Sequence, residues 1–174
     1  QPIVNAKTQE IYKYEALIRY INDNGEVIAP IKFLDIAKKA KLYPYIIEIM
    51  LGEAINLIKQ KNKRVAINIS FEDISSTKTT KKIYKTLHEN KDLVKNLEFE
   101  LLESEEISDF DTVTAFIKEI KTFGCSVGVD DFGAGYSNFN MLANLDIDFV
   151  KIDGSLIKSV DTSKNQEIIV NTIA

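Results

Sequence analysis

Six short apolar runs alternate with amphipathic stretches along this chain, and that alternation constrains the fold more than any other feature. The runs are Pro2–Val4, Tyr12–Tyr20, Val65–Ile69, Leu97–Leu102, Cys125–Val129 and Phe149–Ile152. Their Val, Ile, Phe and Tyr content, with few charges inside, suits strands buried on both faces of a parallel sheet. Apolar residues recur at helical spacing in the stretches Phe33–Ala40, Ile47–Ile58 and Val113–Phe123. This alternation predicts an α/β fold made of right-handed βαβ units.

Two architectures satisfy this pattern, an open doubly wound sheet and a closed (β/α) barrel. No G-x-G-x-x-G follows the first strand, which weakens a dinucleotide-binding interpretation of an open sheet. Five polar residues each lie in or at the end of a different predicted strand: Glu15, Asn68, Glu100, Asp130 and Lys151. Strand ends converge on one face of a barrel, where such enzymes place their chemistry, whereas the outer strands of an open sheet lie too far apart. The barrel is therefore favoured.

Composition limits the class of protein. The 174 residues, 45% of them hydrophobic, suit one domain with a substantial core, and the net charge of −4 argues against a general DNA or RNA binder. No apolar run approaches the roughly 20 residues that span a bilayer, and no signal peptide opens the chain. The single cysteine, Cys125, excludes an internal disulfide framework and fits a reducing compartment. We expect a cytoplasmic domain without membrane contact of its own, although the full-length protein could be membrane-anchored.

Glu15 and Arg19 are charged residues within one predicted strand. Side chains four apart in a strand point to the same side, so the two should share a face. A buried charge must be paired or coordinated. An internal Glu15–Arg19 ion pair and a metal or phosphate site both meet that requirement, and these two residues alone favour the ion pair.

Two more runs carry polar residues that a core does not explain. Asn68 stands between Ile67 and Ile69, so its amide either bonds to backbone or offers its carbonyl oxygen to a hard metal ion. Glu98 and Glu100 alternate with apolar residues and should share one strand face. Strands disfavour that many glutamates unless something neutralises them, and a solvated edge strand is the alternative.

The strongest single motif is the Asp130–Asp131 pair, which ends one run and opens a loop containing Gly133 and Gly135. Adjacent carboxylates repel one another unless a cation lies between them, and hard ions such as Mg²⁺ and Mn²⁺ prefer oxygen ligands. A helix-capping turn is the alternative. Lys151 is also placed inside an apolar run, where a lysine needs a compensating charge. With only one arginine and one lysine expected nearby, the interior carboxylates predict metal ions.

Taken in order, these segments resemble an EAL domain, a cyclic di-GMP phosphodiesterase module, across essentially the whole chain. The matching segments are Gln1–Ile3, the EALIR of Glu15–Arg19, Ile67–Ser70, the ELLE of Glu100–Glu103, the DDFGAGYSN of Asp130–Asn138 and Val150–Asp153. The ELLE segment departs from the family pattern, which usually has threonine where this chain has Leu102. The resemblance implies a (β/α)8 TIM-like barrel whose first strand runs antiparallel to the others.

The resemblance also implies hydrolysis of cyclic di-GMP to linear pGpG with two Mg²⁺ or Mn²⁺ ions, and inhibition by Ca²⁺. One ion would be held by Glu15, Asn68, Glu100 and Asp130, and the second by Asp130 and Asp131. Lys151 and Glu15 would be catalytic, Arg19 and Gln1 would bind substrate, and Glu103 would stabilise the loop after Asp131. The resemblance further implies a bacterial signalling protein with an upstream sensory or cyclase-like domain, and makes a homodimer plausible.

About six strands can be counted, whereas a (β/α)8 barrel typically needs about 250 residues. We therefore expect residues 1–174 to be a partial EAL domain, with strands 1 to 6 present and strands 7 and 8 absent. The family's seventh-strand glutamate would then be missing, and the chain alone would be inactive. The alternative function is a receptor that binds cyclic di-GMP without cleaving it.

Overall fold

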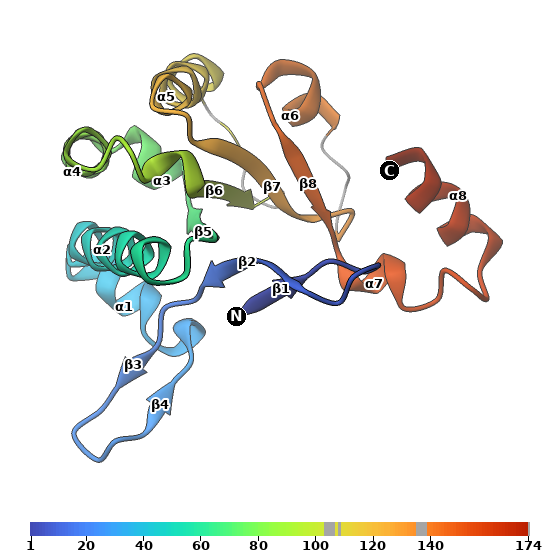
Figure 1. Cartoon of the computed structure of the whole chain (residues 1–174), viewed down its shortest axis with the longest axis horizontal. Coiled ribbons are helices and arrows are strands. Elements are labelled where there is room, and N and C mark those ends of the chain that lie inside the picture. The colour runs from blue at the N-terminus through green and yellow to red at the C-terminus, as the bar shows by residue number, and fades with distance from the viewer. Residues whose placement is uncertain (103–106, 108, 135–138, 174) are drawn as a thin grey trace.

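Six strands form one curled sheet in the order β1-β2-β5-β6-β7-β8 (Figure 1). The computed structural model describes residues 1–102, 107, 109–134 and 139–173. The strands are β1 Pro2–Val4, β2 Ile11–Ala16, β5 Arg64–Ile69, β6 Leu97–Leu102, β7 Ser126–Phe132 and β8 Phe149–Ile152. β1 is antiparallel to β2, and every later pair in the sheet is parallel. The α/β fold and the antiparallel first strand are thus confirmed, and the sheet has the form of an incomplete TIM-like barrel.

Helices cover the outer, convex face of this sheet (Figure 1). They are α1 Leu34–Lys39, α2 Tyr43–Lys61, α3 Phe71–Ser75, α4 Thr77–Glu89, α5 Phe110–Thr122, α6 Phe139–Asn144, α7 Gly154–Ile157 and α8 Lys164–Ile173, with short 3-10 turns η1 Pro30–Lys32 and η2 Val94–Asn96. Within the described part of the chain, none of these helices is long and apolar enough to cross a membrane. The helix starts are set locally, because Ser70, Ser76 and Asp109 accept hydrogen bonds from the first turns of α3, α4 and α5.

The two faces of the sheet differ in polarity because side chains alternate along each strand. In β6, Leu97, Phe99 and Leu101 are buried against the helices, while Glu98 and Glu100 point to the inner face and are also buried. Apolar residues of α2 at helical spacing, Ile47, Leu51, Ala54, Ile55 and Ile58, complete the core on the outer side. The inner face therefore holds the charged residues of the barrel.

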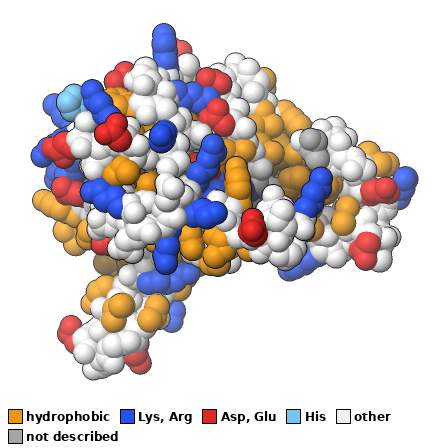
Figure 2. Space-filling model, in the orientation of Figure 1, with side chains coloured by type: hydrophobic (Ala, Val, Ile, Leu, Met, Phe, Trp, Pro, Cys, Tyr) orange, Lys and Arg blue, Asp and Glu red, His pale blue; other side chains and the backbone are white. Residues whose placement is uncertain are grey.

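One local prediction was wrong. The predicted strand Tyr12–Tyr20 ends at Ala16, and the chain then enters a separate hairpin, β3 Tyr20–Ile21 and β4 Val27–Ile28. This hairpin projects from the sheet with Ile21 and Val27 about two-thirds exposed, and Figure 2 shows hydrophobic side chains on its surface. The amphipathic stretch Phe33–Ala40 forms a helix as its spacing predicts, the six-residue α1, although α1 buries no residue fully.

Candidate metal centre at the strand ends

Three carboxylates converge on the inner face at the carboxyl ends of their strands. Glu15 from β2, Glu100 from β6 and Asp130 from β7 each offer one oxygen, and these oxygens lie within 4.8 Å of one another. Burial raises the pKa of the Glu100 carboxyl, even though Lys151 and Lys13 oppose that rise. Three carboxylates this close require a cation among them.

Lys151 of β8 supplies a cation from the protein itself. Its Nζ lies 2.8 Å from Glu100 Oε2, 2.9 Å from Asp130 Oδ2 and 3.2 Å from Glu15 Oε2. Burial alone would lower the pKa of this ammonium, but the bonds to Glu100 and Asp130 outweigh that effect and raise it above its ordinary value. Lys151 is therefore fully charged at neutral pH and occupies the middle of the carboxylate group.

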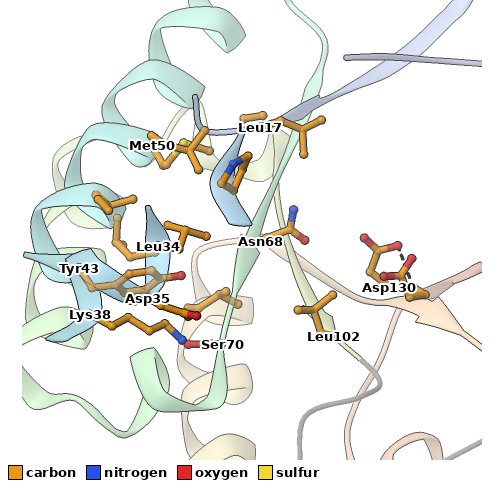
Figure 3. Close-up of a pocket in the computed structure, with 17 residues that line it drawn as sticks. Leu17, Leu34, Asp35, Lys38, Tyr43, Met50, Asn68, Ser70, Leu102 and Asp130 are labelled. Carbon is orange, nitrogen blue, oxygen red and sulfur yellow. Dashed lines mark hydrogen bonds between the residues drawn. The ribbon is translucent and has the colours of Figure 1, made fainter. Parts of the chain in front are cut away.

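Asn68 gives the clearest indication that the oxygen atoms at this centre could bind a metal ion. Its Nδ2 donates to Glu15 Oε1 at 3.2 Å, but its buried Oδ1 has no hydrogen-bond partner among the described residues. Asn68 is paired with Glu100 across β5 and β6, and its side chain points toward Asp130 (Figure 3). A buried carbonyl oxygen without a donor is costly, and a hard cation would satisfy it. The three carboxylates and this oxygen form a suitable set of ligands for a divalent metal ion.

Asp131 is placed differently from Asp130. Both lie between Val129 and Phe132, where the register of the β7–β8 pairing shifts. Asp131 adopts a left-handed backbone (φ 55°), is exposed, and donates its N–H to Asp130 Oδ1 at 2.9 Å. Burial, followed by the charges of Asp130 and Asp153, raises the pKa of its carboxyl. Asp131 is not part of the three-carboxylate group, so the proposed second ion has a less complete set of ligands in this structure.

Sequence reasoning missed two cations that contact the interior glutamates. Lys13 of β2 is buried and contacts both Glu98 and Glu100, and Arg64 of β5, which is exposed, contacts Glu98 at 3.1 Å. The expectation of a single interior lysine was therefore wrong, and the carboxylates are more nearly balanced than predicted. The signal was present, because Lys13 stands two residues before Glu15 in the same strand and must share its face. The alternative of a solvated edge strand for Glu98 is excluded by its burial.

The predicted substrate residues lie at the margin of the centre. Arg19 is exposed beyond the end of β2 and donates to the backbone oxygen of Ile18 at 2.8 Å, so the Glu15–Arg19 ion pair does not form. Gln1 is also exposed, and its terminal ammonium donates to the backbone oxygen of Glu15 at 2.7 Å. Glu103 and the loop residues 135–138 lie outside the described residues. The structure thus brings Glu15, Asn68, Glu100, Asp130 and Lys151 together, with Gln1 beside them.

A cavity of about 380 Å³ opens next to this group (Figure 3). One wall is formed by the metal-centre residues Asn68 and Asp130, together with Asp131. The opposite wall is largely apolar and comes from the segment after β2 and from α1 and α2; Leu17, Leu34, Tyr43 and Met50 are among its residues. With a metal ion among the carboxylates, the arrangement could receive a molecule with an anionic part at that end and a flat, less polar part between the side chains of the apolar wall.

Comparison with known proteins places this geometry in a family. A family model described as EAL domain matches residues 1–174. The chain is 29% identical over 178 residues to the cyclic di-GMP phosphodiesterase PdeF of Escherichia coli, a match that covers 99% of this chain and 24% of that protein. The chain therefore spans about a quarter of the length of this curated relative.

Solved structures agree in fold. An EAL domain protein of Listeria monocytogenes superimposes with a TM-score of 0.89 at 30% identity, covering 99% of this chain and 69% of that one. The phosphodiesterase PaMucR, solved as a complex with cyclic di-GMP, gives a TM-score of 0.84 at 27% identity and covers 99% of this chain and 72% of that one. The curled sheet is the corresponding part of these barrels.

Proposed function

Because this chain belongs to the EAL domain family, we propose that the domain it forms hydrolyses cyclic di-GMP to linear pGpG with the help of divalent metal ions. The observation that carries the proposal is the unsatisfied Oδ1 of Asn68 beside the carboxylates of Glu15, Glu100 and Asp130. A divalent ion bound by these four residues would satisfy that oxygen and offset the repulsion among the carboxylates. The names of PdeF and PaMucR support the same activity.

The donor set favours hard ions. Glu15, Asn68, Glu100 and Asp130 would hold one Mg²⁺ or Mn²⁺, and Asp130 with Asp131 would contribute to a second. Bound ions would supply Lewis-acid polarisation of the phosphodiester and an acidic water. Ca²⁺, which prefers a larger and looser set of ligands, would compete without supporting turnover. The identity and the number of the ions are proposals that the donor chemistry supports.

Individual side chains of this chain would then have separate roles in hydrolysis. The Lys151 ammonium would stabilise negative charge developing on the phosphate and orient the attacking water, while Glu15 would orient the Asn68 amide through the 3.2 Å hydrogen bond. Arg19, which is exposed, and Gln1 would contact phosphate and sugar. Glu103 would support the loop that follows Asp131. The apolar wall of the cavity would receive a guanine, because a nucleobase is planar and its faces are only weakly polar.

We further propose the setting that the family resemblance implies. The domain would work in a bacterial signalling protein behind a sensory or cyclase-like domain, would form a homodimer, and would contact neither DNA nor membrane itself. That the chain matches only 24% of PdeF is compatible with such a setting. The absence of strands 7 and 8 from residues 1–174 and the cytoplasmic location stay predictions.

The direct test is hydrolysis of cyclic di-GMP, with pGpG separated by chromatography, in Mn²⁺ and in excess EDTA. It should be run on residues 1–174 and on a form that continues for about 70 residues beyond residue 174, here called the extended protein. That length would complete a barrel of about 250 residues. We expect Mn²⁺-dependent turnover by the extended protein and little by the shorter one. Tight binding of cyclic di-GMP without turnover by the extended protein would instead identify a receptor, and neither binding nor turnover would contradict the proposal.

A further inference from the structure

Lys13 is buried and charged, yet it has no role in the chemistry proposed above. We propose that Lys13 is a positioning residue that fixes one oxygen of Glu100 so that the other is presented to the metal ion. This inference rests on the proposed function, since it assigns a partner to one of the proposed metal ligands. It concerns the orientation of Glu100 and not the overall charge of the barrel.

The ammonium of Lys13 is enclosed on three sides. Its Nζ lies 2.6 Å from Glu98 Oε2 and 3.2 Å from Glu100 Oε1, and it sits 4.0 Å from the ring centroid of Phe149. The residue is 5% exposed. An ammonium held by two carboxylates and an aromatic face has little freedom to move, so it can act as a fixed anchor.

The Phe149 face is itself held in place by the neighbouring strand. Gly128 of β7 pairs with Phe149 of β8, and a Cβ added at Gly128 would lie 2.2 Å from the Phe149 ring. Only the absence of a side chain at position 128 lets the ring occupy the inner face. The sequence therefore provides a glycine, an aromatic ring and two glutamates around one lysine.

The two oxygens of Glu100 are bound by different lysines. Oε1 accepts from Lys13, and Oε2 accepts from Lys151 at 2.8 Å. These are its hydrogen-bond partners within the described ranges, and the side chain is fully buried. A metal ion at the centre would take Oε2 from Lys151, and Lys13 would then be the contact that keeps the carboxylate from rotating, since the terminal torsion of glutamate is soft.

A matched pair of variants separates orientation from charge. Glu98→Gln alone leaves the Lys13–Glu100 contact in place. Adding Lys13→Met to it removes that contact while also removing one positive charge, so the double variant has the net charge of the wild type. Mn²⁺ affinity, measured by calorimetry, is the readout, with thermal unfolding as the check that each protein is folded. Loss of a partner that orients a metal ligand typically weakens binding by about 10- to 100-fold.

We expect Glu98→Gln to bind Mn²⁺ within about 2-fold of the wild type and the double variant to bind at least about 10-fold more weakly. Saturating Mn²⁺ should restore most of the hydrolysis by the double variant in the extended protein. Equal affinity of the two variants would overturn the inference while leaving the proposed function intact. Failure of the extended wild-type protein to bind Mn²⁺ would instead overturn the proposed function, and this inference with it.

A second measurement needs no variant, and it tests whether Lys13 anchors Glu100 even if the double variant does not fold. In a crystal structure of the wild type with Mn²⁺, Lys13 Nζ should remain within hydrogen-bonding distance of Glu100 Oε1 while Oε2 binds the ion. Coordination of the ion by both oxygens of Glu100, or a Lys13 that has turned away, would contradict the anchoring role.

Discussion

The ammonium of Lys151 lies 2.8 Å from Oε2 of Glu100, at the point where the carboxylates of three strands meet. A side-chain cation thus occupies the place that a metal ion would need. If an ion binds there, the same lysine must give up part of its contacts, and under the proposed function it would then lie beside the substrate phosphate. Lys151 would therefore have two effects of opposite sign, one on metal affinity and one on turnover.

Replacing Lys151→Met should separate these effects. Mn²⁺ should bind at least as tightly as to the wild type, because the competing ammonium is gone. Hydrolysis by the extended protein at saturating Mn²⁺ should fall by about 100-fold or more, since a charge aimed at the phosphate is lost. The comparison requires calorimetry for binding and initial rates for turnover.

Lys121→Met is the control for Lys151→Met. Lys121 makes two carboxylate contacts of similar length, to Asp146 and Asp148, but lies away from the metal centre. The Lys121→Met variant should change neither the Mn²⁺ affinity nor the rate of hydrolysis appreciably. Markedly weaker Mn²⁺ binding by Lys151→Met would show that the lysine organises the carboxylates and does not compete with the ion.

Asn68→Leu tests the unsatisfied amide oxygen. The variant is close in size but offers no ligand, so its Mn²⁺ affinity should fall by at least about 10-fold, whereas Asn68→Asp keeps an oxygen and should bind within a few-fold of the wild type. Titration with Mn²⁺ followed by calorimetry distinguishes them. Unchanged affinity of the leucine variant would remove Asn68 from the metal centre.

Gly128→Ala should destabilise the domain, because the added methyl group would meet the Phe149 ring at 2.2 Å. Overpacking of this kind costs about 1–3 kcal/mol. The matched control is Gly52→Ala in the middle of α2, where nothing lies within 4 Å of the added carbon. That change should stabilise by about 0.5–1 kcal/mol, since alanine is the better helix former. Urea unfolding of both variants measures the change in the free energy of unfolding, which should fall for Gly128→Ala and rise for Gly52→Ala. A stabilised Gly128→Ala would contradict the packing between Gly128 and Phe149.

Cys125 should resist thiol reagents in the folded protein. Burial raises the pKa of its thiol to about 12, and the sulfur donates to the backbone oxygen of Val94. At pH 8 about one molecule in 10⁴ would carry the thiolate, against about a quarter for an ordinary thiol with a pKa of about 8.5. Ellman's reagent should therefore react slowly at pH 8 in buffer and rapidly in guanidinium chloride. Fast reaction of the native protein would indicate an opening of the core around β7.

The sequence was a good guide to the strands and to the polar residues at their ends. Hydrophobic periodicity located all six strands of the main sheet, and the polar residues inside apolar runs, such as Asn68 and Asp130, meet on one face. This succeeded because burying a charged or amide side chain in a strand is costly unless it has a binding partner, so such a residue inside an apolar run indicates a site.

Periodicity failed where tertiary contacts decide the outcome. It extended β2 through Tyr20, because nothing local distinguishes the residues after Ala16 from a continuing strand. Pairing of Tyr20 with Ile28 turns the chain away instead. It also overlooked Lys13 and Arg64, since a lysine or arginine near a strand start usually reaches solvent, as Arg64 does and Lys13 does not. Their partners Glu98 and Glu100 lie more than 30 residues away in the chain, so only the folded sheet brings them together.

Crystals of the protein grown with Mn²⁺ would show through anomalous scattering whether the carboxylate group is a metal centre. We expect a peak about 2.1 Å from Asn68 Oδ1 and from oxygens of Glu15, Glu100 and Asp130, with Lys151 displaced from the centre of the group. A peak elsewhere, or full occupancy of the centre by Lys151 at saturating Mn²⁺, would contradict that expectation.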